Sequence, residues 1–316
     1  MLYLNTPYSA MQAMFKEAAA IGASEIRLDL ELSGVFANPN SPPDWSGVDQ
    51  YMSLARRYRL RVLADLTATP SYMAHCPTAT PAGSPSWICP PSDPGLWGRE
   101  AGEIAAYTRG VINDFEIINE PDGSWAFLGT PQQYALVLVS AYDAIHAVNP
   151  HARVALGGLM NIGADGVTWM NAMLATAGTD ARHKFDIANI HIRTPNPADT
   201  GAVVRGWRHY FSHIGFDGPL WVTETGYPAN PTFQTQPSYQ DGPNAQARWM
   251  TTAIPAMLHA GAAIVFATER DTMTGPFASE GVLQSTDPLT INSVYTRRPS
   301  FYAVRTLAHR NRRAAN

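Results

Sequence analysis

Short apolar segments alternate along the whole chain with longer segments of helical periodicity. The apolar segments are nearly continuous, as in VALGGL at 154–159 and AAIVFA at 262–267. Such runs are typical of parallel strands that are covered on both faces. The pattern predicts eight strands, over Leu2–Asn5, Glu25–Leu30, Arg61–Leu66, Asp114–Asn119, Arg153–Leu159, Asp186–Ile192, Leu220–Thr225 and Ala262–Thr268.

Between these strands, apolar residues recur at intervals close to 3.6 residues. In Pro131–Val148, for example, Tyr134 and Val137 are followed by Ala141 and Ile145. This period indicates helices that bury one face. We expect helices over Met11–Ile21, Gly47–Tyr58, Leu96–Arg109, Pro131–Val148, Val167–Ala177, Val203–Ile214, Asn244–Ala260 and Ser300–His309.

Eight strand–helix alternations in 316 residues predict an α/β fold, a (β/α)8 barrel. The main competitor, a doubly wound open sheet, carries a Gly-rich fingerprint after its first strand, and residues 5–8 contain none. No linker divides the chain, so we expect a single domain over residues 1–316. In a barrel, the segments that follow the strands build the catalytic face. The segments of interest are Thr67–Pro94, Thr194–Thr200, Gly226–Asp241 and Arg270–Pro299, and all but the short Thr194–Thr200 are long and contain aromatic residues.

A glutamate stands at the end of the fourth predicted strand and another at the end of the seventh. The first is Glu120, in the sequence Asn-Glu-Pro, and the second is Glu224, in the sequence Thr-Glu-Thr-Gly. Strands four and seven of such a barrel face each other across its mouth, so both carboxyl groups can reach one cavity. Glycosidic cleavage needs two facing carboxyl groups, about 5–5.5 Å apart for retention and about 6.5–9.5 Å apart for inversion.

These motifs resemble the signature of clan-A retaining glycoside hydrolases, and the overall run is most similar to family-39-like enzymes, with family 5 as near relatives. The resemblance implies a (β/α)8 barrel that hydrolyses a β-glycoside or polysaccharide by double displacement. Its partner would be a carbohydrate. The resemblance extends over nearly the whole chain, through Glu25–Ser33, Asp44–Ser46, Ala68–Pro70, Gly157–Gly158 and Arg298–Tyr302.

Residue by residue, the resemblance implies that Glu120 is the general acid/base and Glu224 the nucleophile. Asn119 matches the residue that binds the 2-hydroxyl group of the substrate. Arg27 matches an arginine beside the nucleophile, whose positive charge would keep Glu224 ionised. His191 matches a frequent active-site histidine of the clan. Glu120 would need partly buried, less polar surroundings to remain a proton donor.

The sequence departs from the clan pattern at three places. Arg193 stands where the clan often carries a tyrosine, Leu32 stands where a tryptophan is common, and Phe266–Glu269 replaces a tryptophan after the eighth strand. These changes leave the identity of the sugar open. Arg193 would suit an anionic sugar, but the interpretation we favour is an ion pair with a surface carboxylate such as Asp186 or Asp199.

Aromatic side chains in the loops could stack on sugar rings. Trp125 and Tyr227 follow the two glutamates by five and three residues and are the favoured candidates, and His75 is a further candidate for substrate contact. Five other aromatic residues could stack on sugar or pack the loops: Trp87, Trp97, Phe127, Phe233 and Tyr239.

Several of these residues also have a structural interpretation. Arg27 could form an ion pair inside the barrel, and His191 could be a core histidine with satisfied hydrogen bonds. Glu31 and Glu269 also lie near strand ends, where a salt bridge to a neighbouring arginine is the favoured interpretation.

Other function classes fit the sequence less well. A carbohydrate-binding barrel with weak or lost catalysis, the main alternative, would have no reason to keep both glutamates. A metal-dependent barrel hydrolase would show His-x-His after the first strand, where residues 3–5 read Tyr-Leu-Asn. We therefore expect neither a metal nor another cofactor. An interaction scaffold predicts no cluster of acids in a cavity.

Composition excludes two further classes. The net charge is −4, so no basic surplus is present to bind nucleic acid. The longest apolar runs fall far short of the ~20 residues of a membrane span. The oligomeric state cannot be read from the sequence.

The two cysteines, Cys76 and Cys89, lie in a stretch rich in Pro, Ser and Thr. They are too few for a structural zinc site, which leaves a disulfide or two free thiols. We expect a disulfide, which points to an oxidising compartment and so to a secreted or extracellular protein. No signal peptide precedes Leu2, so the leader is expected to be missing from this chain.

Overall fold

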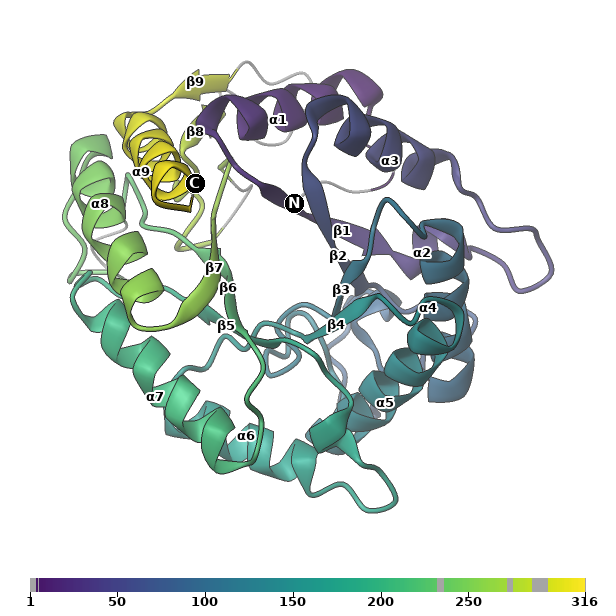
Figure 1. Cartoon of the computed structure of the whole chain (residues 1–316). Helices are drawn as coiled ribbons and strands as arrows, with labels where there is room; N and C mark the ends of the chain where they lie inside the picture. The colour runs from purple at the N-terminus through teal and green to yellow at the C-terminus, as the bar shows by residue number, and fades with distance from the viewer. Residues whose placement is uncertain (1–3, 5, 232–235, 272–274, 286–294, 316) are drawn as a thin grey trace.

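The computed structural model describes residues 4, 6–231, 236–271, 275–285 and 295–315, with helices arranged around a ring of parallel strands (Figure 1). The strands are β1 (Glu25–Glu31), β2 (Arg61–Thr67), β3 (Asp114–Ile117), β4 (Arg153–Leu156), β5 (Ala188–Ile192), β6 (Leu220–Thr225), β7 (Ala262–Ala267), β8 (Leu283–Ser285) and β9 (Tyr295–Arg297). The helices are α1 (Tyr8–Ile21), α2 (Leu32–Val35), α3 (Ser46–Tyr58), α4 (Pro94–Tyr107), α5 (Pro131–Val148), α6 (Ala164–Leu174), α7 (Asp199–His213), α8 (Pro243–His259) and α9 (Pro299–Ala315).

The strands pair in the order that a barrel requires. Strands β1-β2-β3-β4 form one parallel sheet and β5-β6-β7 form another. Two isolated parallel bridges, Ala155–Ile187 and Leu159–Ile190, join the sheets. The predicted (β/α)8 fold class is confirmed, and β1 to β7 are the second to eighth predicted strands. Within the described ranges no strand joins β7 to β1, because the first predicted strand, Leu2–Asn5, lies outside them apart from Leu4.

Most predicted elements occur with small shifts at their ends. Helix α5 and strand β6 match the expected limits, whereas β3 and β4 end earlier than expected. Strand β3 stops at Ile117 because Ile118 has a positive φ of 61°, which no strand accommodates. The antiparallel pair β8–β9 and the short helix α2 were not predicted.

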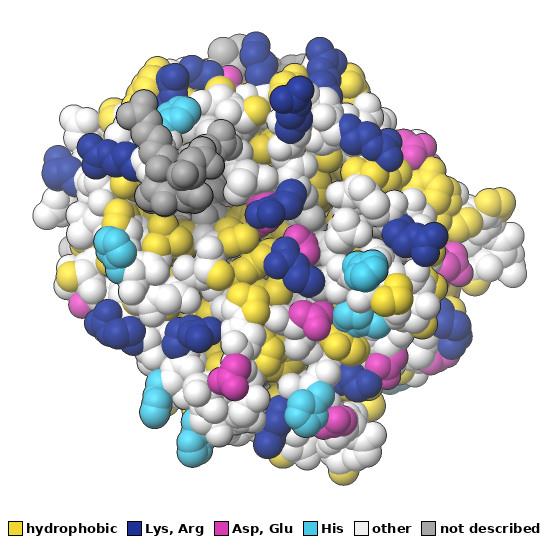
Figure 2. All heavy atoms as spheres, in the orientation of Figure 1, with side chains coloured by type: hydrophobic (Ala, Val, Ile, Leu, Met, Phe, Trp, Pro, Cys, Tyr) yellow, Lys and Arg dark blue, Asp and Glu magenta, His cyan; other side chains and the backbone are white. Residues whose placement is uncertain are grey.

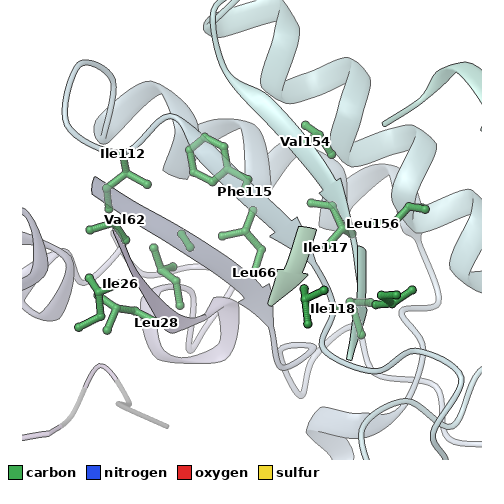
Figure 3. Packing of buried hydrophobic residues seen from close by; sticks show 14 of the residues in the cluster. Ile26, Leu28, Val62, Leu66, Ile112, Phe115, Ile117, Ile118, Val154 and Leu156 are labelled. Atoms are coloured by element: carbon green, nitrogen blue, oxygen red, sulfur yellow. The ribbon is translucent and has the colours of Figure 1, made fainter. Parts of the chain in front are cut away.

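Alternate strand residues serve two different cores. Ile26 and Leu28 on β1 and Phe115 on β3 belong to the large cluster that packs strands against helices (Figure 3). A second, smaller cluster fills the barrel interior with Leu63, Ala155, Ile187 and Trp221. Each side chain buried in this way contributes roughly 1.5–3 kcal/mol. Leu63 on β2 and Trp221 on β6 share their strands with Asp65 and Glu224, two charged residues of the candidate site.

The predicted disulfide is present. Cys76 and Cys89 are bonded within the loop between β2 and α4. The two arms of this loop also pair through the backbone, since the His75 amide donates to the Pro90 carbonyl and the Ser92 amide donates to the Met73 carbonyl. The disulfide therefore holds together two arms that are already hydrogen-bonded.

The surface carries mixed charges. Figure 2 shows one face on which Lys and Arg side chains are spread among acidic, histidine and hydrophobic ones. A search of the described helices finds none that combines the length and the apolar character of a membrane span. The expectation against nucleic-acid binding stays a prediction.

Candidate active site

Glu224 points into the barrel because β6 contains a bulge. Ile190 pairs with Val222, but the next residue, His191, pairs with Glu224, so Thr223 is an extra residue in β6. A bulge changes the direction of the side chains that follow it. Thr223 and Glu224 consequently both line the interior cavity.

Glu120 reaches the same cavity through a strained turn. After β3 the backbone adopts positive φ angles at Ile118 (61°) and Glu120 (40°), which non-glycine residues rarely occupy. The segment that follows β4 passes close to this turn and has a glycine there, Gly157. A Cβ atom at this position would lie 2.0 Å from the Ile118 carbonyl oxygen, so a larger residue would collide with the turn. The nearest oxygen atoms of Glu120 and Glu224 that could serve as ligands lie within 4.8 Å of each other.

His191 is hydrogen-bonded on both ring nitrogens. Its Nδ1 lies 2.6 Å from Glu120 Oε1 and its Nε2 lies 3.0 Å from Thr223 Oγ1. The Thr223 hydroxyl donates its only proton to Asn189 Oδ1, at 2.9 Å, so it must accept from Nε2–H. His191 Nδ1 is then the atom that shares a proton with Glu120. Gly158 leaves space for the ring, since a Cβ there would lie 2.0 Å from Nε2.

Arg27 on β1 links the two halves of the site. Its Nε and Nη2 donate to the two oxygens of Glu116, at 2.7 and 3.0 Å, and Nη2 also donates to Asn119 Oδ1 at 2.9 Å. Its Nη1 donates to Glu224 Oε1 at 3.0 Å. Arg27 therefore lies beside Glu224, as the resemblance implied, and its hydrogen bond to Asn119 fixes that side chain as well.

A row of buried carboxyl groups supports Arg27. The strand register places Asp29 beside Asp65, and Asp65 beside Glu116, across β1, β2 and β3. Asp65 lies 3.2 Å from Arg27 Nη2, and burial raises the pKa of Asp65 well above its usual value. This row was missed from the sequence, although its signal is visible there. Acidic residues occupy alternate positions in otherwise apolar strands.

Arg193 is placed differently from the expectation. It does not pair with Asp186 or Asp199; its Nη2 donates to Glu224 Oε2 at 2.7 Å and to Glu280 Oε1 at 2.9 Å. The reason is strand alternation, which puts residues 191 and 193 on the same inward side. Glu280, a second residue that the sequence did not reveal, comes from the segment before β8 and is 2% exposed.

The charges around Glu224 favour its ionised form. Burial by itself raises the pKa of Glu224, but the positive charges of His191 (when protonated), Arg193 and Arg27 lower that pKa well below the usual range. Both carboxylate oxygens accept a hydrogen bond from an arginine. Glu224 is therefore held as an anion, whereas Glu120 shares a proton with a histidine.

Glu120, His191 and Glu224 also form a donor set that a divalent cation would accept, because their ligand atoms lie within 4.8 Å of one another. However, Arg193 Nη2 lies 2.7 Å from Glu224 and Arg193 Nη1 lies 3.5 Å from Glu120. A cation would have to bind beside this guanidinium group. The arrangement favours the chemistry of two carboxyl groups, and the absence of a metal stays a prediction.

A cavity of about 1320 Å³ gives access to both glutamates. Trp125, which is 48% exposed, lines it together with Glu120, Met160 and Ile162. Glu269 lines it on the opposite side, and burial, reinforced by the charge of Glu17, raises the pKa of Glu269 to about 8. The cavity continues along the edges of β1 and β7 to α1 and α9.

Other predicted contact residues lie elsewhere. Tyr227 is 3% exposed and packs between Tyr239 and Trp249, so its ring presents no free face to a sugar. His75 is exposed in the disulfide loop and is not among the residues that line the cavity. Trp97, Phe127 and Tyr239 are buried, Trp87 is exposed outside the cavity lining, and Phe233 lies outside the described residues.

The sequence matches no protein-family model and no curated protein. Among solved structures, a family 39 glycoside hydrolase from the gut symbiont Bacteroides cellulosilyticus has a TM-score of 0.73 at 17% identity, over 97% of this chain and 62% of that chain. A monomeric beta-xylosidase from Caulobacter crescentus has a TM-score of 0.73 at 17% identity, over 96% of this chain and 66% of that one. A GH5_18 protein from Streptomyces cattleya, solved with Manβ1-4GlcNAc, has a TM-score of 0.69 at 17% identity, over 98% of this chain and 77% of that one.

These similarities concern the backbone, since the identities are low. The chain spans less than two thirds of the length of the family 39 enzyme. The TM-scores nevertheless show that this chain shares its overall fold with all three. The chain therefore has the fold of clan-A glycoside hydrolases, as its motifs predicted.

Proposed function

We propose that this protein is a retaining glycoside hydrolase in which Glu224 is the nucleophile and Glu120 the general acid/base. The observation that carries the proposal is the contrast between two carboxyl groups in one cavity. Glu224 is held as an anion by two arginines, and Glu120 shares a proton with His191. Environments that separate the proton affinities of two carboxyl groups are typical of acid/base pairs.

The distance between the two side chains supports retention. Their nearest oxygens lie within 4.8 Å, whereas inverting enzymes keep their carboxyl groups about 6.5–9.5 Å apart to admit a water molecule. Glu224 would attack the anomeric carbon while Glu120 gives its proton to the departing oxygen. In the second step Glu120 would take a proton from water, which then breaks the bond between the sugar and Glu224.

The remaining contacts suit this assignment. Asn119 lies next to Glu120 with its Oδ1 bound to Arg27, so its amide group is oriented for a sugar hydroxyl. Trp125 lines the same cavity as Glu120 and is partly exposed, so its ring is available to stack on the leaving group. The disulfide fits a secreted enzyme, and we take residues 1–316 as one catalytic domain.

The test is hydrolysis of a panel of 4-nitrophenyl β-glycosides, with the glucoside, xyloside and mannoside first. These sugars correspond to a beta-glucosidase, a beta-xylosidase and an exo-beta-1,4-mannosidase among the similar solved structures. Proton NMR of the first product should show the β-anomer. Binding without turnover would favour the carbohydrate-binding alternative, and an α-anomer would contradict the assignment of Glu224.

A further inference from the structure

Arg193 is a fixed cation rather than a mobile side chain. Its Nε donates to Glu280 Oε2 at 2.9 Å and its Nη2 donates to Glu280 Oε1 at 2.9 Å, which is the two-pronged geometry of strong arginine–carboxylate pairs. Thr268 Oγ1 donates to the same Oε1 at 2.9 Å. The ring of Phe277 lies 5.3 Å from the guanidinium carbon. Together these contacts fix the orientation of the guanidinium group of Arg193.

That orientation directs Arg193 at the nucleophile. Its Nη2 lies 2.7 Å from Glu224 Oε2, while Arg27 holds the other oxygen, Oε1, at 3.0 Å. Because each arginine donates to a different oxygen of the Glu224 carboxylate, the two together fix the plane of this carboxylate. Tyrosine, which the clan often carries at the position of Arg193, could supply a hydrogen bond but no charge.

Local sequence around Glu224 provides the space for this arrangement. Gly226 follows two residues later, and a Cβ atom there would lie 2.5 Å from Glu280 Oε2. Any side chain at this position would displace Glu280, and with it the support of Arg193. The glycine of the Thr-Glu-Thr-Gly motif therefore has a steric role toward Glu280.

Both of the arginines that donate to Glu224 already have an acidic partner of their own. Glu280 matches the charge of Arg193, and Glu116 matches that of Arg27 through two hydrogen bonds. A carboxylate on the substrate would meet Glu224 and Glu280 next to Arg193, at a cost in repulsion and desolvation. An uncharged sugar meets no such cost.

We propose that Arg193, oriented by Glu280, is a positioning residue that holds Glu224 ionised and aimed, and that the sugar bound beside Glu224 is uncharged. This inference rests on the proposed glycosidase function. It assigns Arg193 to the enzyme's own nucleophile and not to the recognition of substrate charge.

The proposal has a consequence for pH dependence. Removal of one arginine should raise the pKa of Glu224, because the guanidinium group stabilises the carboxylate anion more than the neutral carboxyl group. The acid limb of kcat/KM should then move to higher pH. Among the described residues, several charged or titratable groups act on Glu224 or on its two arginines. They are Arg27, Asp29, Asp65, Glu116, Glu120, His191, Arg193 and Glu280.

The kinetic experiment compares the wild type with Arg193→Met, Arg193→Lys and Glu280→Gln on an aryl β-glucoside and the corresponding β-glucuronide. We expect the wild type to prefer the glucoside. Arg193→Met should lower kcat about 10- to 100-fold with little change in KM and raise the acid limb by about one pH unit or more. Arg193→Lys should restore part of the rate, and Glu280→Gln should give the same changes to a smaller extent.

A matched control comes from Arg297, which forms a similar two-pronged pair with Glu17 outside the cavity. Arg297→Met should leave the acid limb unchanged, and thermal melting identifies any variant that does not fold. The proposal is overturned if the wild type prefers the glucuronide and Arg193→Met loses that substrate alone. It is also overturned if the acid limb of Arg193→Met coincides with that of the wild type.

A second measurement needs no turnover. In protein labelled with ¹³C at glutamate carboxyl groups, Glu224→Gln identifies the Glu224 signal, which is then titrated in the wild type and in Arg193→Met. An upward shift of the pKa of Glu224 in a protein that cleaves no glycoside would refute the glycosidase proposal alone. An unshifted pKa in an active enzyme would refute the positioning role alone.

Discussion

Glu120 and Glu224 lie in one cavity with His191 and Arg193 near both of them, but the hydrogen bonds that the two carboxyl groups accept differ. Glu120 is 4% exposed and touches His191, whereas both oxygens of Glu224 accept hydrogen bonds from arginines. A charged neighbour of opposite sign favours the ionised carboxylate. The two side chains are thus chemically distinct, and substitution should reveal different roles.

In the proposed mechanism Glu224→Ala removes the attacking group, so every substrate should fail together. Glu120→Ala removes only the proton donor and the later base, so an activated aryl glycoside should still form the glycosyl-enzyme while its hydrolysis slows. General acid/base catalysis is worth about 10²–10⁴-fold, and we expect a loss of this size on unactivated glycosides. Steady-state kinetics on matched activated and unactivated substrates measures the difference.

Azide provides the control for this pair of variants. It should rescue Glu120→Ala with a β-glycosyl azide as product, and it should give the α-glycosyl azide with Glu224→Ala. The opposite pattern would exchange the two assignments, and wild-type activity in both variants would remove the site from catalysis.

Trp125 should affect the leaving group rather than the second chemical step. It lines the same cavity as Glu120, which protonates the departing group in the proposed mechanism. Trp125→Ala should lower kcat/KM for a disaccharide about tenfold, since aromatic contacts contribute about 0.5–1.5 kcal/mol beyond burial. The rate of hydrolysis of a trapped glycosyl-enzyme should stay the same. Trp87→Ala, a comparably exposed tryptophan outside the cavity lining, is the matched control.

The positions of Arg27 and His191 could be predicted from the sequence because each stands within a recognisable motif on a strand. The partner of Arg193 could not be predicted. Glu280 is 87 residues away in a segment without helical or strand period, so only the folded chain brings the two together. The inward packing of Tyr227 could not be predicted for a related reason, since the sequence does not distinguish a loop aromatic that stacks on substrate from one that packs inward.

The disulfide in the loop between β2 and α4 should affect the stability of the protein and not its catalytic rate. None of residues 67–94 lines the cavity. Replacing Cys76 and Cys89 by serine should lower the free energy of unfolding by ~3 kcal/mol in the chain-entropy model, with kcat unchanged below the melting transition. Urea unfolding of the variant and of the wild type, each with and without dithiothreitol, measures this. A loss in the variant that exceeds the effect of reduction would point to lost packing instead.

Strand ends were harder to predict than strands. Hydrophobicity continues through Ile118 and through Leu159, but the hydrogen-bonded ladder stops where φ becomes positive or where Gly157 lets another segment approach. These backbone changes are what carry Glu120 into the cavity. At the ends of both β3 and β4, the backbone that shapes the site therefore starts where the hydrophobic pattern no longer predicts its conformation.

For the whole molecule, one buried carboxyl group should make stability depend on pH. Glu100 on α4 is 6% exposed and accepts a hydrogen bond from the Tyr72 hydroxyl. Burial raises the pKa of Glu100 to about 7 against a lowering effect of Tyr72. Between about pH 4.5 and 7 the folded state therefore binds more protons than the unfolded state, and stability falls as the pH rises through this window.

Glu100→Gln cannot ionise and should escape this loss. Its free energy of unfolding, relative to the wild type, should increase from pH 5 to pH 8 by at most about 3 kcal/mol, since one pKa unit corresponds to ~1.4 kcal/mol. Urea unfolding at the two pH values tests this. The exposed neighbour Glu103 serves as the control, and an equal effect of Glu103→Gln would show that general charge repulsion is responsible.

At this scale the sequence was most informative. The alternation of apolar runs and helical periods predicted the α/β barrel and the order of its strands, because every element buries a face with its own period. The interior could be predicted only in part. The row of Asp29, Asp65 and Glu116 depends on strand register, which the pattern of a single strand does not contain.

Because Thr223 is an extra residue in β6, the direction of the Glu224 side chain depends on how many residues the strand contains. Deleting one residue there would preserve the hydrophobic character of the strand and turn the carboxyl group toward the helices. A point substitution leaves the number of residues in β6 unchanged. During evolution the lining of the cavity can therefore change one side chain at a time while the direction of the Glu224 side chain stays the same.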